Sequence, residues 1–441
     1  MNPQRFLRLV SGAMAALGIS AAAIVALNLR GEDPLPSAET LKPTPALVAQ
    51  GEYLTRVGNC MACHTVQGGA PFAGGRGIET PFGVVYSSNL TPDKATGLGA
   101  WTSAEFWRAM HNGRGKDGRL LYPAFPYTSY THVTREDSDA IFAYLQSLPP
   151  VAQANKAHVL RFPYSTQAAL GVWRALFFTP ADVAQPAASA PQALATAQVP
   201  DYQRGAYLVN GLGHCAACHT PRNSLGAEQQ GQALAGGLIP VQNWLAPALT
   251  DAGQAGVQRW PQADVVALLK TGVAPQASVI GPMAEVVFRS TQYLSDADAR
   301  AMAVYLQALP QHAATPAKQA VAPASVMERG AKVYEAQCAQ CHGAQGQGAK
   351  DEAGQPAFPP LAGNRAVVLA DPTNLVRVVL QGGYLPATAG NPRPHGMPPF
   401  QHLLGDEDVA AVTTFVRNSW GNQAAGVGTI EVYRARERRS P

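Results

Sequence analysis

The feature that most constrains this chain is a pentapeptide that occurs three times. The copies are Cys60-Met-Ala-Cys63-His64, Cys215-Ala-Ala-Cys218-His219 and Cys338-Ala-Gln-Cys341-His342. Two thiols at this spacing can form thioethers with the two vinyl groups of a haem, and the adjacent His can then bind the iron as its proximal ligand. A single C-x-x-C is also compatible with a zinc half-site or a redox dithiol. Three copies, each followed at once by His and together using every cysteine, predict three covalently bound haem c groups.

The length and composition of the chain agree with several small haem domains. At about 100–200 residues per domain, a chain of 441 residues is long enough for about three. The 42 glycines and 36 prolines indicate much irregular backbone, as expected where a chain wraps a flat cofactor. A formal net charge of +4, without a basic stripe interleaved with aromatic residues, gives no indication of nucleic-acid binding.

The first 32 residues contain an apolar segment. Arg5 and Arg8 precede an uncharged run from residue 9 to residue 29, which Arg30 closes. At ~1.5 Å per residue in a helix, this run reaches about the thickness of a bilayer core. We therefore predict that residues 1–32 form a membrane anchor. The two arginines favour a cytoplasmic N-terminus, with the haem domains on the other side of the membrane. A cleaved secretory signal is the alternative, and the alanines at 21–23 are compatible with it.

Each haem motif lies within a repeated arrangement of helices. The helices expected before the motifs contain Gly51-Glu-Tyr-Leu, Gly205-Ala-Tyr-Leu and Gly330-Ala-Lys-Val-Tyr. Each repeat ends in a further helix, whose start is marked by Thr134, Ser295 or Gly405 followed by acidic residues. First and last helices of this kind around a haem motif describe the class I cytochrome c fold. The sequence thus predicts an all-α protein with three tandem class I cytochrome c domains after the N-terminal membrane-anchor helix. We place them at residues 46–152, 200–310 and 325–421.

The repeat and the segments between the domains can also be read from the sequence. Residues 101–113 match residues 260–272 at a constant offset of 159, without gaps. The linkers at 180–200 and 310–325 are rich in Ala, Pro and Gln, which predicts semi-extended tethers. Residues 422–441 end in a basic tail with Arg434, Arg436, Arg438 and Arg439. We predict that this tail is frayed and available to a partner or to anionic lipid.

A low-spin haem needs a sixth iron ligand, commonly a Met thioether. The second domain offers Met283 in Gly281-Pro-Met283, and the third offers Met397 in Gly396-Met397-Pro398-Pro399. Both methionines lie in proline-containing loops between the middle and last helices, where the chain must cross the distal face of the haem. Core packing is the commoner role of a Met, but this loop position favours ligation.

The first domain departs from this pattern. The matching loop reads Tyr122-Pro-Ala-Phe125-Pro126, and Phe cannot bind iron. Met110 aligns with Leu269, which predicts core packing, and His111 aligns with Lys270, which predicts an exposed helix end. His132 lies two residues before the cap Thr134. Each of these three remains a candidate ligand, beside an open or water-ligated iron, since an empty sixth position permits ligand chemistry at haem.

Other residues near the motifs have supporting roles in this interpretation. His214 is expected to pack or hydrogen-bond near a haem edge, and His395 and His402 are expected to make loop hydrogen bonds or solvent contacts. The carbonyl of Pro360 is expected to accept a hydrogen bond from His342, which would fix the ring and raise its basicity.

At this point the chain resembles a known family, the three-haem cytochrome c subunits of bacterial membrane-bound dehydrogenases. These include the quinoprotein alcohol dehydrogenases and the flavin-linked gluconate dehydrogenases. The resemblance covers about residues 46–421 and is carried by residues 80–93 (TPFGVVYSSNLTPD), 121–130 (LYPAFPYTSY), 213–223 (GHCAACHTPRN) and Gly281-Pro-Met283. It implies that the haems carry electrons from a catalytic partner to membrane ubiquinone or a terminal acceptor. The positions that match the family are Cys60, Cys63, His64, Cys215, Cys218, His219, Cys338, Cys341, His342, Met283 and Met397.

One difference leaves the class of partner open. The alcohol dehydrogenase subunits typically have Met where this chain has Phe125. The Phe form, together with residues 171–178 (GVWRALFF), looks closer to cytochromes that accompany molybdenum hydroxylases acting on aldehydes or N-heterocycles. A molybdenum hydroxylase and a quinoprotein or flavoprotein dehydrogenase are both compatible with the resemblance.

The leading hypothesis for function is an electron-transfer subunit without a catalytic residue of its own, because haems need only their ligands and surroundings to transfer electrons. A peroxidase-like or ligand-binding haem in the first domain is the rival, motivated by Phe125. It lacks the distal acid and base groups that peroxide chemistry requires, since the loop offers Phe125 and Tyr127 instead. A cytochrome module of a terminal oxidase is a third hypothesis, weakened by the lack of further apolar spans in the sequence.

Overall fold

A computed structural model of the chain describes residues 3–32, 34–35, 41–311, 322–352, 354 and 356–437. Its internal contacts divide the chain into two compact units. Unit 1 comprises residues 1–55, 63–186 and 224–227, and unit 2 comprises residues 56–62, 187–223 and 228–441. The predicted first domain falls mainly in unit 1, and the predicted second and third domains fall in unit 2. The division into three domains stays a prediction.

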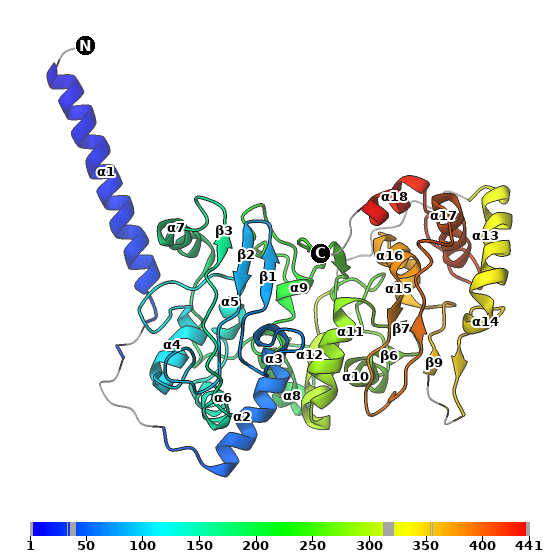
Figure 1. The fold of residues 1–441 in the computed structure, drawn as a ribbon, viewed down its shortest axis with the longest axis horizontal. Helices are drawn as coiled ribbons and strands as arrows, with labels where there is room; N and C mark the ends of the chain where they lie inside the picture. The colour runs from blue at the N-terminus through cyan, green and yellow to red at the C-terminus, as the bar shows by residue number, and fades with distance from the viewer. Residues whose placement is uncertain are drawn as a thin grey trace. The chain divides into compact units, whose positions relative to one another are not determined.

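Unit 1 contains helices and one small sheet. Its elements are α1 (Pro3–Leu29), α2 (Pro45–Val57), α3 (Cys60–His64), β1 (Gly77–Thr80), β2 (Gly83–Tyr86), α4 (Ser103–Asn112), α5 (Tyr127–Tyr130), α6 (Arg135–Ser147), β3 (Val159–Leu160) and α7 (Gln167–Phe177), as Figure 1 shows; α2 and α3 run across the division between the units. The strands form an antiparallel sheet in the order β1-β2-β3. Helix α6 begins as predicted, because the hydroxyl of Thr134 accepts a hydrogen bond from the backbone N–H of Asp137.

The N-terminal segment forms the single long helix α1. Residues Ser11–Leu29 have a mean hydropathy of 1.9 and are exposed, so by length and composition this helix could cross a membrane, as a signal sequence also could. Its C-terminal end contacts unit 1: the amide of Asn28 donates to the carbonyl of Gly171 in α7 and accepts from Arg174. Glu32 forms an ion pair with Arg114 at 2.8 Å. The side chains of Arg5 and Arg8 lie outside the described residues.

Unit 2 begins with the elements of the predicted second domain. These are η1 (Thr196–Gln198), α8 (Val199–Asn210), α9 (Ala216–His219), β4 (Gly237–Ile239), β5 (Trp244–Ala246), α10 (Gln262–Thr271), β6 (Val273–Ala274), β7 (Ala277–Ser278), α11 (Pro282–Arg289), η2 (Thr291–Tyr293) and α12 (Asp296–Gln307). Helix α12 begins after Ser295, whose hydroxyl accepts from the N–H of Asp298 as predicted. The predicted repeat is also visible, because α4 and α10 both end at a glycine in the left-handed region, Gly113 and Gly272.

The rest of unit 2 holds the elements of the predicted third domain. These are α13 (Ala324–Gln337), α14 (Ala339–His342), β8 (Ala349–Lys350), β9 (Pro356–Phe358), α15 (Arg365–Val368), α16 (Thr373–Gln381), β10 (Gly383–Tyr384), β11 (Gly396–Met397), α17 (Asp406–Arg417) and α18 (Thr429–Glu437). Helices α13 and α17 lie side by side (Figure 1). Gly405 caps α17, and Asp406, Glu407 and Asp408 fill its first turn, as predicted.

A glycine lies at the crossing of the first and last helices in each repeat. A Cβ atom added to Gly51 would lie 2.5 Å from the carbonyl carbon of Ala140 in α6. The same addition at Gly205 would lie 2.6 Å from the carbonyl carbon of Ala301, and at Gly330 it would lie 2.6 Å from Cβ of Phe415. Only glycine lets the two helix backbones approach so closely. This crossing fixes the helix that leads into each haem motif.

Two fold predictions need correction. The all-α prediction is too narrow, because the described chain contains a three-stranded sheet and four two-stranded ribbons. The basic tail is not frayed over residues 429–437, since it forms α18. Val432 is fully buried, and Arg436 pairs with Asp406 at 2.8 Å. Burial of Val432 and Ala435 and the ion pair of Arg436 hold α18 in place. Arg438 and Arg439 lie outside the described residues.

Candidate functional site

The three C-x-x-C-H motifs all form short helical segments, in α3, α9 and α14. The structure describes all six cysteines and joins none of them in a disulfide. A helical turn places residues three apart on one side, which is the arrangement that two thioether bonds to one haem require. The His that follows the second Cys then lies on the same short helix.

In the second and third motifs, the surroundings of the thiols argue against the redox alternative. Burial, together with the neighbouring Cys218, raises the pKa of Cys215 to about 12. Burial also raises the pKa of Cys338 to about 11. Redox-active C-x-x-C motifs have the opposite property, a lowered pKa that yields a reactive thiolate. Among the described residues, no group of three or more His, Cys, Asp or Glu side chains is placed to hold a metal ion. Conversion to neutral thioethers fits buried thiols of this kind.

The imidazole of each motif makes the same kind of hydrogen bond, from Nδ1 to a backbone carbonyl. Nδ1 of His64 lies 2.7 Å from the carbonyl of Ser88, Nδ1 of His219 lies 2.8 Å from that of Pro247, and Nδ1 of His342 lies 3.0 Å from that of Pro359. A carbonyl can only accept, so Nδ1 carries the proton and Nε2 keeps its lone pair for iron.

Burial lowers the pKa of all three histidines, which favours the neutral imidazole that binds metals. The carbonyl expected at His342 was that of Pro360, and the structure corrects this to Pro359. Pro360 instead accepts from the amide of Asn364, because the chain turns by one residue more than the sequence indicated.

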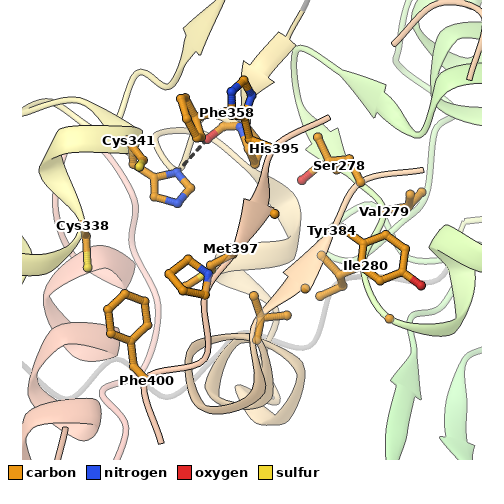
Figure 2. Close-up of a pocket in the computed structure, with 18 of the residues that line it drawn as sticks. Ser278, Val279, Ile280, Cys338, Cys341, Phe358, Tyr384, His395, Met397 and Phe400 are labelled. Carbon is orange, nitrogen blue, oxygen red and sulfur yellow. Dashed lines mark hydrogen bonds between the residues drawn. The ribbon is translucent and has the colours of Figure 1, made fainter. Parts of the chain in front are cut away.

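The predicted third domain contains a cavity between its motif and Met397. Cys338 and Cys341 line one part of the wall, and Met397 and Phe400 line another, as Figure 2 shows. His342 also lines this cavity. The wall of this cavity is mostly apolar, and part of the cavity is open to solvent. An apolar cavity that joins two thiols, an imidazole and a thioether fits a covalently bound haem.

Met283 lies in the first turn of α11, directly after Gly281 and Pro282. Gly281 has φ +54°, in the region that favours glycine. Met283 is partly buried and packs against a cluster of Val279, Ala284 and Val287. Pro282 at the start of the helix presets its backbone angle. Met283 lies between α10 and α12 as predicted, but in a helix and not in a loop, because Pro282 starts α11 directly after Gly281. Its role as a ligand stays a prediction.

The first domain has Phe125 in the corresponding loop. Its ring packs edge-on against Tyr130, with centroids 5.4 Å apart. Met110 is buried on α4, in agreement with core packing. The expectation of an exposed His111 is wrong. This residue is only 6% exposed and its ring stacks on Trp107, because the aromatic neighbour one turn earlier covers it. His132 is half-buried, and burial lowers its pKa.

The other histidines behave mostly as the sequence indicated. His214 is partly buried, has φ +38° and forms a hydrogen bond with the backbone of Gly58, within unit 2. The ring of His395 packs against Phe358, with centroids 4.6 Å apart, and His402 is exposed.

The sequence interpretation missed the carbonyls that orient two of the three proximal histidines. The internal repeat could have indicated them, because Ser88 and Pro247 are 159 residues apart, the same offset that relates residues 101–113 to residues 260–272. It also missed a contact from α16 to the strand before Pro247, made by Asn374 and Arg377. These side chains carry no recognisable motif, so the sequence alone offered no signal for them.

Comparisons with known proteins agree with this geometry. A family model described as Cytochrome c matches residues 48–149, 202–310 and 327–420. The cytochrome c subunit of alcohol dehydrogenase (quinone) from Gluconacetobacter polyoxogenes is 38% identical over 426 residues, which cover 92% of this chain and 87% of that protein. The gluconate 2-dehydrogenase cytochrome c subunit of Pantoea cypripedii is 39% identical over 401 residues, 88% of each chain. The fructose dehydrogenase cytochrome subunit of Gluconobacter japonicus is 35% identical over 431 residues, which cover 90% of this chain and 85% of that protein.

Proposed function

Because the chain belongs to the cytochrome c family, with the cytochrome c subunits of bacterial alcohol, gluconate and fructose dehydrogenases, we propose that it carries electrons on three haem c groups from a partner dehydrogenase to ubiquinone or a terminal acceptor. As a cytochrome c subunit it is an electron-transfer subunit, and substrate oxidation belongs to another subunit of the complex. Bound haem c supplies a one-electron iron couple. The observation that carries the proposal is the threefold recurrence of a C-x-x-C-H helix whose His is held by a backbone carbonyl.

The chain's own residues have three tasks in this proposal. The six cysteines attach the haems, and His64, His219 and His342 bind iron from the proximal side. Met283 and Met397 bind iron from the distal side of the second and third haems. The apolar walls around Met397 exclude water, and together with thioether ligation this raises the potential of the bound iron.

The haem count and the ligands can be tested directly. Full-length protein produced with a cytochrome c maturation system should contain three haems per chain in a pyridine haemochrome assay. Paired Cys→Ala substitution in one motif should remove one haem. Met283→Leu and Met397→Leu should each abolish the methionine–iron charge-transfer absorption of one haem. Reduction by the partner with its substrate, together with no peroxide turnover by the subunit alone, is the expected functional result. Rapid peroxide turnover would contradict the proposal.

A second function is favoured by Phe125 at the position of the distal Met. We infer that the haem of the first domain has a weakly held or open sixth position, which exogenous ligands can occupy. Cyanide and carbon monoxide should then bind one haem in three. If all three haems show Met ligation and resist cyanide, this second function is excluded.

The remaining parts of the proposal concern the surroundings of the protein. We infer that α1 anchors it in the inner membrane, with the haem groups on the periplasmic side. The apolar composition of α1 supports this assignment. Resistance of the protein to carbonate extraction, with an intact N-terminus, is the expected result. The partner is a quinoprotein, a flavoprotein or a molybdenum hydroxylase, and cofactor analysis of the co-purified complex distinguishes these classes.

A further inference from the structure

Helix α16 contacts two different parts of unit 2, the cavity of the predicted third domain and a strand of the predicted second domain. Leu375, Val378 and Val379 line the space beside His342 and Met397. Asn374 and Arg377 instead contact the turn and strand at residues 242–245, which belong to the predicted second domain. One short helix therefore forms a wall of the third haem site and holds a strand of the second domain.

The contact is polar, buried and specific. The amide of Asn374 donates to the carbonyl of Leu245 at 2.7 Å and accepts from its N–H at 2.9 Å. The guanidinium of Arg377 donates to the carbonyls of Gln242 at 2.5 Å and Asn243 at 2.7 Å. It also lies over the ring of Trp244, 4.5 Å from its centroid. Asn374 is 4% exposed and Arg377 is 1% exposed, so solvent cannot replace these bonds.

The turn held in this way is strained by itself. Val241 has φ +64° and Asn243 has φ +54°, and a β-branched residue such as Val is especially unfavourable in this region. Such a conformation persists only when surrounding contacts fix it. The charge-assisted bonds from Arg377 to the adjacent carbonyls supply such contacts.

Strand β5, to which Asn374 and Arg377 bind, lies in a segment that contacts the surroundings of both proposed ligands of the second haem. Two residues after Leu245, the carbonyl of Pro247 accepts the hydrogen bond from Nδ1 of His219 at 2.8 Å. At the start of the strand, the ring of Trp244 covers Gly281 so closely that an added Cβ would lie 2.8 Å from three ring atoms. Gly281 directly precedes Pro282 and Met283. The proximal carbonyl and the support of the distal loop thus belong to one segment of four residues.

We propose that Asn374 and Arg377 are positioning residues for the second haem, which hold its two axial ligands in place from the predicted third domain. The inference rests on the proposed ligand pair His219 and Met283. Loosening the strand lets Trp244 withdraw from Gly281, and the Met283 thioether then leaves the iron for part of the time. A bound haem whose iron lost the Met283 thioether would have a lower midpoint potential, because thioether ligation favours ferrous iron.

The test uses full-length protein carrying its haems, with carbon monoxide as the probe. Arg377→Met should let carbon monoxide bind one more ferrous haem per chain than in the parent protein, and should lower the midpoint potential of that haem. The affected haem is identified with Met283→Leu. Met283→Leu alone should add one site for carbon monoxide, and adding Arg377→Met to it should add none. Asn374→Ala keeps the guanidinium and removes both bonds to Leu245, so it should act in the same direction more weakly.

Arg417→Met is the matched control. Arg417 is also a fully buried arginine of unit 2, and it donates to the carbonyls of Val367 and Leu369 at 2.8 Å, away from residues 242–245. It should destabilise the protein and leave the potential and carbon monoxide binding of the second haem unchanged.

The outcomes separate this inference from the proposed function. If Met283→Leu adds no site for carbon monoxide, the proposed ligand itself is wrong. If it adds one but folded Arg377→Met and Asn374→Ala do not, the positioning role is overturned. A fall in potential confined to Arg377→Met, without carbon monoxide binding, would indicate a charge effect alone and would also overturn it.

Discussion

The glycine crossings yield a prediction whose size follows from the structure. In Gly51→Ala the new Cβ would lie 2.5 Å from the carbonyl carbon of Ala140 and 2.8 Å from Cβ of Tyr144. Both distances are about 1 Å shorter than van der Waals contact between carbon atoms allows, so α2 and α6 must separate. Inserting a methyl into a packed contact costs about 1–3 kcal/mol, and rigid backbone on the opposing side favours the upper end. Replacing a glycine in a helix interior by alanine stabilises the helix by about 1 kcal/mol. We therefore expect a net loss of about 2 kcal/mol in the free energy of unfolding.

Gly171→Ala is the matched control within the same unit. Gly171 is also interior to a helix, α7, but its added Cβ would lie 3.7 Å from Leu120 and 3.9 Å from Ile24, ordinary contact distances. This variant should gain about 0.5–1 kcal/mol from helix propensity alone. Denaturant titration of the haem protein, followed by far-ultraviolet circular dichroism and Soret absorbance, measures both. Equal stability of Gly51→Ala and Gly171→Ala would refute the argument that the crossing requires glycine.

Three further predictions concern stability. Asn422→Ala should cost about 3 kcal/mol, because the buried amide bonds to Gly363, Leu361 and Val416, all at 2.9 Å, and the loss should appear in denaturant titration monitored at Trp420 fluorescence. Thr102→Ala should cost about 1 kcal/mol by removing the capping box that Thr102 forms with Glu105, and an unchanged melting temperature would contradict it. Tyr127 is fully buried, and burial raises its pKa to about 12. Its protonated form therefore stabilises the folded state fully below pH ~10, and this contribution is lost as pH rises towards ~12. Tyr127→Phe should reduce the fall in unfolding free energy over that window by about 2 kcal/mol, and an identical pH dependence in variant and parent would exclude it.

Much of the fold and of the site followed from local patterns in the sequence. The haem motifs, the caps at Thr134 and Ser295, and the repeat between α4 and α10 each depend on residues close together in the chain. The two caps and the repeat were confirmed in the structure, whereas haem attachment and the iron ligands stay predictions. The family resemblance was confirmed as well, because the motifs that carried it are numerous and specific.

What the sequence did not predict depends on contacts between distant residues. The strands of the two-stranded ribbons have only two or three residues, which is too short to show an alternation of apolar and polar residues. Each ribbon forms only when the loops that carry its two strands meet. The repeat alignment predicted an exposed His111 at a helix end, and only the packing of Trp107 on its ring buries it. Arg377 reads as a surface charge on an amphipathic helix, and only its placement beside residues 242–245 makes it a buried donor.

The glycine crossings also bear on how the protein matures. A chain is made from its N-terminus, so Cys60 to His64 are complete well before Ala140, against which Gly51 closes. Until α6 has been made, α2 has no packing partner at this crossing. The same order holds for Gly205 with Ala301 and for Gly330 with Ala411. In each repeat, the helix before the C-x-x-C-H motif therefore gains this contact only after the last helix of the repeat has been made.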